Sequence, residues 1–531
     1  MHRFNLRRLL PLALALVLGL TSCGINPVTG KHELQFVSES QELEIGRTQY
    51  APARQSQGGD FEVLPEITAY VNEVGQKLAA VSDRRLPYEF VVLNSSVPNA
   101  WALPGGKIAI NRGLLTALDN EAELAAVLGH EIVHAAARHG AKSQERGILL
   151  QLGMVAAQVG VAMSDVGATA GNLIVGGAGL GAALTATKYG RDAELEADHY
   201  GMIYMKRAGY DPQGAVTLQE KFVKLAEEKG GKQGWLEGLF ASHPPSPERV
   251  ALNKATLAEL GNPGGDLGQQ RYASHMAPLE KIEPAYDKAD KALALARKDD
   301  FAQASRLAAE AARLVPKEGR FPQLQGDIAL AQKEPGAALK FYEKSIALDD
   351  HYFASYLGAG RAQYQLKTGD RGQGYLERST KLLPTAPAYY YLGEIARANG
   401  NRQEAMEYFK AAGSSDSSLG QQAALEFARL DFPQNGTKYI AAGIQADGFG
   451  NLMVVVENRA PFAVSGILVT PVLVDAYGQV QQQGRQLRIN QVLQPGERAA
   501  VNPGIGQLTD AVRQNLRVRV DAVVESQAAA R

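Results

Sequence analysis

The chain has 531 residues, which is too long for a single hydrophobic core and predicts two to four domains. Its formal net charge is -1 and its Lys and Arg residues are spread along the sequence, so nucleic acid is not expected as a partner. A single cysteine, Cys23, excludes an intramolecular disulfide.

The first 22 residues are arranged like a signal peptide, with a basic region, an apolar region and a candidate cleavage site. Basic residues precede an apolar run from Leu9 to Leu20, which is too short to span a bilayer. The run ends in Leu-Thr-Ser followed by Cys23, which resembles the end of a bacterial lipoprotein signal. This resemblance implies a signal peptide over residues 1–22 and acylation of Cys23. We therefore expect a lipid-anchored protein on the periplasmic side of the outer membrane, rather than a lone buried cysteine in a short anchor helix.

Residues 23–275 are predicted to form one domain with helices and a small sheet. A first helix is expected before the loop at residues 55–59. Strands are expected at residues 88–93 and 107–111, with a turn at residues 102–106 between them. We expect the second of these strands to lie at an edge of the sheet, where an extended peptide backbone can pair with it.

A helix is predicted over residues 121–138 (EAELAAVLGHEIVHAAAR), which have apolar residues at helical spacing and no proline. His130 and His134 are four residues apart, so both imidazoles project from one face and can bind one metal ion. Glu131 lies beside them as a candidate general base. The alternative is an ordinary amphipathic helix with two incidental histidines.

The segment at residues 148–186 is apolar and rich in glycine, and a membrane-embedded hairpin is one interpretation. Polar residues interrupt it, and neither half reaches the roughly 18 unbroken apolar residues that a membrane span requires. We expect buried or surface-active helices, with a flap that contacts lipid as the alternative.

An HExxH site needs a third protein ligand. In metzincins this is a histidine six residues after the second one, but Gly140 stands there. On a continuous helix His139 lies about 140° round from His134, so we expect it at the surface or as a helix cap.

A carboxylate from a later helix is the other source of a third ligand, and residues 191–198 (RDAELEAD) are the candidate. Glu194 and Asp198 share a helical face, whereas Glu196 points away. Glu194 can then bind zinc, and Asp198 can accept the outer N–H of a ligating histidine. The alternative is a solvated acidic helix face.

Residues 276–432 are repetitive. One column of large residues recurs every 34 positions, and a column of glycines follows steps of 34 and 33. The two columns are Leu307, Phe341, Tyr375 and Phe409, and Gly326, Gly360 and Gly393. A helix–turn–helix period of this length is typical of tetratricopeptide repeats, whose stacked units form an α-solenoid that binds partners.

The last part of the chain, residues 433–531, contains strand-like runs at residues 452–456, 467–474 and 516–520 with Gly and Asn between them. These runs predict a small antiparallel β-sandwich. No residues typical of a catalytic or binding site stand out in this part.

The motif HEIVH at residues 130–134, followed by ELEAD at residues 194–198, resembles the gluzincins of metallopeptidase family forty-eight. Two other segments, NPVTG at residues 26–30 and NAWALPGG at residues 99–106, match the same family. With the lipoprotein signal and the repeats, the chain is similar to BepA-like periplasmic lipoprotein proteases. The resemblance implies a mostly helical zincin-type peptidase domain and one Zn²⁺ per chain. It also implies specific roles: His130, His134 and Glu194 as zinc ligands, Glu131 as catalytic base and Asp198 as the support of a ligand.

The same resemblance draws attention to residues 243–249 (HPPSPER). It implies that His243 lies beside the metal, where it either stabilises the oxyanion or occupies the open zinc position and keeps the enzyme inactive. Arg249 is then expected to be a partner for the oxyanion or for a nearby carboxylate. A proline-rich turn with an incidental histidine is the alternative.

The predicted function is therefore a zinc-dependent endopeptidase of the cell envelope. It would cleave misfolded or misassembled envelope proteins by attack of a zinc-bound water, with the repeats docking on assembly machinery. The second hypothesis is a chaperone-like assembly scaffold that acts through its repeats, with proteolysis mostly latent. A prenyl-type protease with a membrane chamber is disfavoured, because spanning segments are missing.

Overall fold

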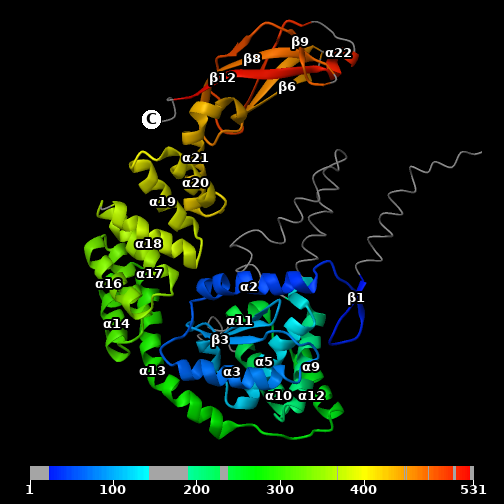
Figure 1. The fold of residues 1–531 in the computed structure, drawn as a ribbon, viewed down its shortest axis with the longest axis vertical. Helices are drawn as coiled ribbons and strands as arrows, with labels where there is room; N and C mark the ends of the chain where they lie inside the picture. Colours follow the sequence, from blue (N-terminus) through cyan, green and yellow to red (C-terminus); the bar gives the residue numbers. More distant parts are fainter. Residues whose placement is uncertain are drawn as a thin grey trace, which may run out of the picture. The chain divides into compact units, whose positions relative to one another are not determined.

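The computed structural model describes residues 23–142, 189–227, 237–367, 369–447, 449, 451–475, 477–505 and 510–526. The chain divides into two compact units, Met1–Gly358 and Ala359–Arg531 (Figure 1). This division falls inside the predicted repeat region, and the predicted domain boundaries stay predictions.

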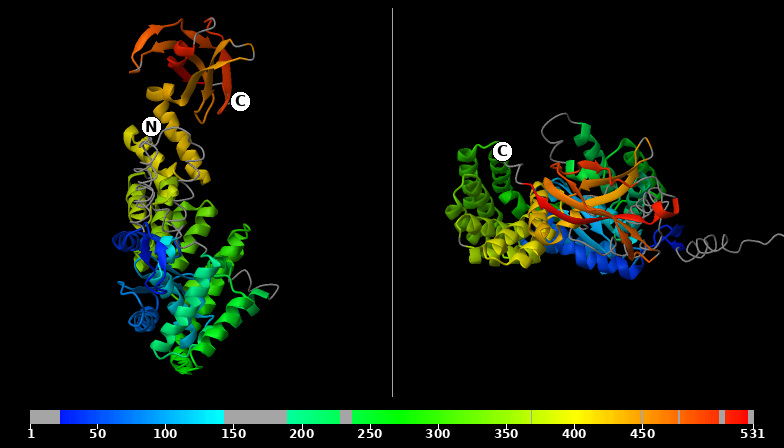
Figure 2. Two further views of the ribbon diagram at one scale, coloured as in Figure 1. Left: turned by 90° about the vertical axis from the view of Figure 1, so that its right-hand side faces the viewer. Right: turned by 90° about the horizontal axis from the view of Figure 1, so that it is seen from above.

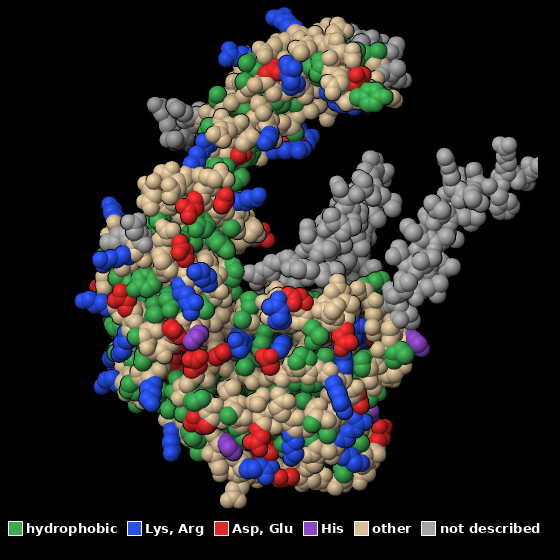
Figure 3. All heavy atoms as spheres, viewed as in Figure 1, with side chains coloured by type: hydrophobic (Ala, Val, Ile, Leu, Met, Phe, Trp, Pro, Cys, Tyr) green, Lys and Arg blue, Asp and Glu red, His purple; other side chains and the backbone are tan. Residues whose placement is uncertain are grey.

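The predicted signal peptide and the apolar segment at residues 148–186 lie outside the described residues. Within the described ranges, no helix has both the length and the apolar character needed to cross a membrane. On the face drawn in Figure 3, basic and acidic side chains are interspersed, as the even distribution of charge along the sequence indicates.

The described chain begins with an antiparallel hairpin of β1 (Cys23–Ile25) and β2 (His32–Leu34). Asn26 closes the hairpin, because its side-chain oxygen accepts hydrogen bonds from the backbone N–H groups of Val28 and Thr29. The helix α2 (Glu39–Ser56) follows, and a capping box of Ser38 and Gln41 fixes its start.

The first unit contains a small sheet with the strand order β3 (Glu89–Leu93), β5 (Lys107–Asn111), β4 (Ala100–Leu103). β3 pairs in parallel with β5, and β4 pairs antiparallel with it across a turn in which Gly105 and Gly106 have positive φ. The prediction that the strand at 107–111 is an edge strand is therefore wrong, because β5 has a partner on each side. β4 is the edge strand that lies against the helix of the HExxH motif.

Helices surround this sheet, and α5 (Glu121–Ala136), which carries the HExxH motif, is buried along its whole length. It packs against β4 and against three helices on its other sides: α3 (Pro65–Ala79), α9 (Arg191–Arg207) and α10 (Gln213–Glu227). The remaining helices of this part are α4 (Arg112–Leu115), α11 (Glu237–Ser242) and α12 (Pro247–Glu259).

Two glycines bring α5 and α9 together. A Cβ added at Gly129 would lie 3.2 Å from the carbonyl oxygen of Gly201, and one added at Gly201 would lie 3.2 Å from the backbone N of His130. The backbones of the two helices can approach this closely because neither position carries a side chain. The close approach places the first histidine of the motif directly beside the acidic residues of α9.

The hydrophobic core of the first unit continues from the part that contains the β3–β5–β4 sheet into the first repeat helices. Buried Arg112 joins the two parts, since its guanidinium pairs with Glu283 at 2.5 Å and stacks on the ring of Tyr286 at 3.6 Å. We infer that these first helices are integral to the fold of the part that contains the sheet.

Paired helices make up the repeat region, and consecutive helices pack side by side within each unit (Figures 1 and 2). Their bounds are α13 (Gln269–Ala296), α14 (Phe301–Leu314), α15 (Arg320–Ala331), α16 (Pro335–Leu348), α17 (Phe353–Gln365), α18 (Gly369–Leu382), α19 (Ala386–Ala398), α20 (Arg402–Ala412) and α21 (Ser418–Asn435).

The marker glycines of the repeats each receive a large side chain from the following helix. A Cβ at these positions would meet side-chain atoms within 2.7 Å. The pairs are Gly326 with Tyr342, Gly360 with Leu376, and Gly393 with Phe409. These three buried partners follow the same steps of 34 and 33 as the glycines. Two of them, Tyr342 and Leu376, come one residue after Phe341 and Tyr375 of the recurring column, and Phe409 belongs to the column itself.

Two antiparallel sheets form the C-terminal part. One has the order β11–β7–β6, and the other has the order β10–β8–β12 with β9 also paired to β8. Their buried residues form one shared hydrophobic cluster. The bounds are β6 (Ile440–Ala446), β7 (Leu452–Asn458), β8 (Val464–Val474), β9 (Val480–Gln483), β10 (Leu487–Ile489), β11 (Arg498–Val501) and β12 (Leu516–Glu525), with η2 (Gly436–Tyr439) before the sheets and α22 (Asp510–Gln514) before β12.

Candidate metal centre

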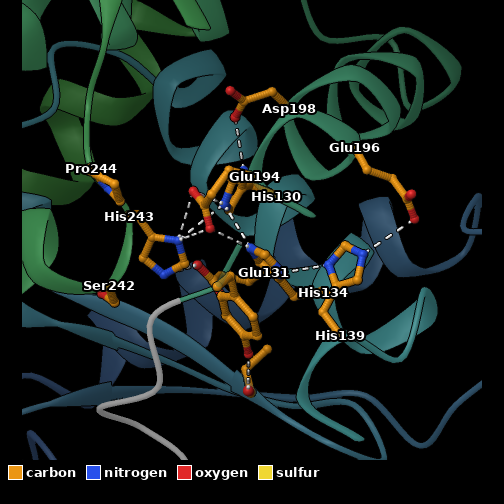
Figure 4. A network of polar contacts seen from close by, with 12 residues as sticks. His130, Glu131, His134, His139, Glu194, Glu196, Asp198, Ser242, His243 and Pro244 are labelled. Carbon is orange, nitrogen blue, oxygen red and sulfur yellow. Dashed lines mark hydrogen bonds and ion pairs between the residues drawn. The ribbon is translucent and has the colours of Figure 1, made fainter. Parts of the chain in front are cut away.

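Three buried side chains from two helices converge at one point. The Nε2 atoms of His130 and His134, one turn apart on α5, lie 3.0 Å from each other. Glu194 on α9 reaches the same point, with one carboxylate oxygen 3.5 Å from His130 Nε2 and the other 3.4 Å from His134 Nε2 (Figure 4). The structure therefore brings together the three donors that the sequence predicts.

Asp198 and Arg249 support this group from one side. Asp198, one turn after Glu194, lies 2.9 Å from the outer nitrogen, Nδ1, of His130. Arg249 donates two hydrogen bonds of 2.7 Å to Asp198 and lies 3.0 Å from Glu194. Of the two roles expected for Arg249, its geometry matches that of a partner for nearby carboxylates.

Local structure explains why Arg249 points into the centre. Ser246 caps the start of α12, accepting a hydrogen bond from the backbone N–H of Arg249, and Pro247 occupies the first helical position. Arg249 thus lies in the first turn of a helix that packs on α9.

His243 lies within the group of donors. Its Nδ1 is 3.0 Å from Glu194 and 3.3 Å from His130 Nε2, and its Nε2 is 3.5 Å from Glu131. The donor atoms of His130, His134, Glu194 and His243 all lie within 4.8 Å of one another. The sequence expectation that His243 lies beside the metal donors matches this geometry.

The carboxyl of Glu131 is buried and has one oxygen without a hydrogen-bond partner among the described residues. Burial raises the pKa of its carboxyl, while the neighbouring His243 and His130 imidazoles act in the opposite direction. Its Oε2 atom is buried and has no hydrogen-bond partner among the described residues. A buried carboxylate oxygen of this kind is suited to accept a proton from a small polar molecule in the centre.

The pKa values of the two histidines of the motif are shifted in opposite directions. Burial opposes protonation of His130, but the Glu194 and Asp198 carboxylates overcome it and raise its pKa to about 10. Burial holds the pKa of His134 well below its usual value. Burial also disfavours ionised Glu194 and Asp198, yet the cationic groups beside them keep both pKa values low.

His139 departs from its sequence expectation, because it is buried rather than at the surface. α5 ends at Ala136 and Arg138 has a φ of 64°, so a turn at residues 137–138 interrupts the helix before a new helical stretch begins at His139. His139 Nδ1 consequently lies 2.8 Å from His134 Nδ1, and its Nε2 lies 3.3 Å from Glu196 (Figure 4). The angle of 140° holds only for a helix that continues past residue 136, and α5 ends there.

Sequence reasoning missed Tyr189. Its ring stacks on the His134 ring with centroids 3.9 Å apart, and its hydroxyl donates a hydrogen bond of 3.4 Å to the Ala102 carbonyl on β4. Tyr189 belongs to no motif with a recognisable spacing, so only its position two residues before α9 could have indicated it.

A narrow apolar pocket opens beside the donors. Its polar lining includes His130, Glu131 and His243 of the centre, together with Asp198 and Arg249. The remaining wall is mostly apolar and includes Ala100, Met202, Met205, Leu218, Phe222 and Leu239. The centre therefore adjoins a space suited to an apolar side chain.

The donor set fits zinc. Two imidazole nitrogens and one carboxylate are typical of a catalytic zinc site, whereas Ca²⁺ and Mg²⁺ prefer sites built from oxygen alone. Each histidine has a partner at Nδ1, which leaves its Nε2 directed at the common point. These features define the class of the site as an HExxH metallopeptidase centre with a glutamate from a later helix.

Comparisons with known proteins agree with this class. The profile described as "Peptidase family M48" matches residues 65–256. Metalloprotease YcaL of Escherichia coli K12 is 30% identical over 193 residues, which cover 35% of this chain and 70% of that protein. The chain belongs to peptidase family M48, whose members are zinc-dependent metallopeptidases.

Two further relatives are longer than the matching region. Mitochondrial metalloendopeptidase OMA1 of Schizosaccharomyces pombe is 30% identical over 239 residues, covering 44% of this chain and 66% of that protein. The beta-barrel assembly-enhancing protease of Yersinia pestis is 31% identical over 213 residues, covering 37% of this chain and 44% of that protein. The chain thus spans less than two thirds of these curated relatives.

Proposed function

We propose that the protein is a zinc-dependent endopeptidase, lipid-anchored at Cys23 in the cell envelope, that cleaves misfolded or misassembled envelope proteins. The observation that carries this proposal is the buried convergence of His130, His134 and Glu194, with Glu131 beside them. The name of the Yersinia relative supports an envelope location and envelope substrates. The repeat helices support docking on other proteins of the assembly machinery.

His130, His134 and Glu194 would hold the zinc ion. Such an ion lowers the pKa of water towards 7 and polarises a peptide carbonyl. Asp198 accepts the Nδ1–H of His130 and so directs the lone pair of Nε2 inwards. Arg249 holds Asp198 and Glu194 in place and is thus a positioning residue.

Glu131 would act as the general base and then as the acid. It takes a proton from water as the water oxygen bonds to the carbonyl carbon, and it passes that proton to the amide nitrogen as the C–N bond breaks. The raised pKa of its carboxyl favours this shuttle at neutral pH. His243 is placed to donate an N–H to the developing oxyanion once it turns away from Glu194.

The substrate backbone would pair with β4. This strand uses one edge to pair with β5, and its first residue, Ala100, lines the pocket beside the donors. An extended peptide added at the other edge makes main-chain hydrogen bonds that depend little on sequence, which suits unfolded substrates. The Tyr189 hydroxyl occupies one of the acceptors, the Ala102 carbonyl, and has to yield it to such a peptide.

The substitution Glu131→Gln tests this mechanism. It keeps the size of the side chain but removes the basic carboxylate, so we expect hydrolysis of an unfolded protein to fall by about a hundredfold or more. The zinc content of the variant should equal that of the wild type. Undiminished hydrolysis with zinc bound would contradict the assigned base.

A second candidate is an assembly scaffold whose proteolysis is mostly latent. The position of His243 favours it, since Nδ1 lies where a fourth donor would complete the group. The substitution His243→Ala distinguishes the scaffold from the active endopeptidase. Peptide hydrolysis faster than in the wild type indicates that His243 keeps the site latent, and slower hydrolysis indicates that His243 takes part in catalysis. Full support of envelope assembly by Glu131→Gln would favour the scaffold.

A further inference from the structure

We propose that His139 and Glu196, together with Asn26, form a hydrogen-bonded chain that positions the metal ligand His134 and fixes its tautomer. The proposal rests on the proposed function in one respect, namely that His134 binds the metal through Nε2. It assigns a role to three residues that lie outside the ligand set and that the sequence did not connect.

The contacts run in one line away from the centre. His134 Nδ1 lies 2.8 Å from His139 Nδ1, and His139 Nε2 lies 3.3 Å from Glu196 Oε1 (Figure 4). The side-chain N–H of Asn26 then reaches the same oxygen of Glu196 at 3.1 Å. His134, His139 and Asn26 are all buried, and Glu196 is half-buried.

The directions of these hydrogen bonds are mutually consistent. A neutral His134 that presents its Nε2 lone pair to a metal carries its proton on Nδ1, so Nδ1 donates to His139. His139 then accepts at Nδ1 and carries its own proton on Nε2, which donates to the Glu196 carboxylate. Asn26 donates to that carboxylate as well. Every donor along this line therefore meets an acceptor.

Rigid neighbours fix the position of His139. The preceding residue, Arg138, has a left-handed backbone conformation, and its guanidinium donates to Glu42 and to the Val37 carbonyl. Asn26 is fixed by its own hydrogen bonds within the β1–β2 hairpin and by a second contact with Glu33. The N-terminal hairpin thus holds Asn26 at the outer end of the hydrogen-bonded chain, and the start of α2 holds the turn that carries His139 at its inner end.

The affinity for zinc in three full-length variants tests the assignment, measured by competition with a chelator. His139→Leu removes the acceptor, and we expect zinc binding to weaken by about ten- to a hundredfold, the usual effect of losing such a partner. His139→Gln can still accept from His134 and donate to Glu196, so its affinity should return to within a few-fold of the wild type. His199→Leu is the matched control, because His199 on α9 contacts Thr256 instead, and its affinity should not change.

Two further measurements distinguish a role of His139 in positioning His134 from a role in the stability of the fold. They are the melting temperatures of the metal-free proteins and the absorption spectra of the cobalt-loaded proteins. Positioning predicts a changed cobalt spectrum in His139→Leu and a nearly unchanged metal-free melting temperature. If His139→Leu does not fold, Glu196→Gln replaces it, and a measurable loss of zinc affinity is again expected. Wild-type zinc affinity in a folded His139→Leu or in Glu196→Gln would overturn this inference alone. A wild-type protein that binds no zinc would overturn the proposed function as well.

Discussion

The two histidines of the motif sit one helical turn apart but are supported by different kinds of chemistry. His130 faces a charged network in which Asp198 is paired with the Arg249 guanidinium. His134 faces a neutral histidine, His139, and a carboxylate only beyond it. The first arrangement favours a protonated imidazole and the second favours a neutral one.

The difference also concerns which parts of the chain provide the support. α9 contributes to both sides, with Asp198 on the side of His130 and Glu196 on the side of His134. α12 adds Arg249 on the first side, whereas the N-terminal hairpin and the turn after α5 add Asn26 and His139 on the second. We therefore expect the segment next to the expected lipid anchor to affect the position of His134. We expect the stability of the fold to depend mainly on the charged residues around His130.

The largest effect is expected from removing the charge of Arg249. Arg249→Met removes the buried guanidinium that pairs with Asp198 and Glu194, which costs about 3–5 kcal/mol of unfolding free energy. Glu196→Gln, on the His134 side, alters hydrogen bonds near solvent and should cost about 1 kcal/mol or less. Urea denaturation of the metal-free proteins measures both values. Equal losses in the two variants would contradict the contrast drawn between the two sides.

The pH dependence of the unfolding free energy tests whether the pairing of Asp198 with Arg249 stabilises the His130 side. Arg249 overcomes the effect of burial and holds the pKa of Asp198 below its usual value of about 3.9. A carboxyl with a lowered pKa in the folded state contributes stability above its unfolded pKa and loses it as the pH falls through the folded value. The difference in unfolding free energy between wild type and Arg249→Met should therefore shrink as the pH falls from about 7 towards about 3, because the wild type loses the stability that ionised Asp198 contributes. A difference that stays constant over this range would show that Asp198 is not the group stabilised by Arg249.

The features that the sequence predicted are those that depend on local periodicity. His130 and His134, and likewise Glu194 and Asp198, share helix faces because residues four apart always do. Pairing HExxH with the later acidic motif then gave the donor set. The repeat period was visible for the same reason, since Gly326 and its equivalents recur with the helix pairs.

The features that the sequence did not predict depend on contacts between distant segments. The prediction for His139 required knowing that α5 ends at Ala136, and the left-handed Arg138 that turns the chain is held by residues about a hundred positions earlier. The place of β5 in the sheet depends on its pairing with β3, which no local pattern in β5 encodes. Tyr189 likewise meets His134 only through the packing of the fold.

The zinc content of the purified full-length protein, compared with that of Glu194→Ala, tests the central claim most directly. The exposed Asp192, two residues earlier on α9, provides the control variant Asp192→Ala. We expect about one zinc ion per chain in the wild type and in Asp192→Ala, and close to none in Glu194→Ala. One zinc ion per chain retained by Glu194→Ala, or none in the wild type, would contradict the assignment of Glu194 as a zinc ligand.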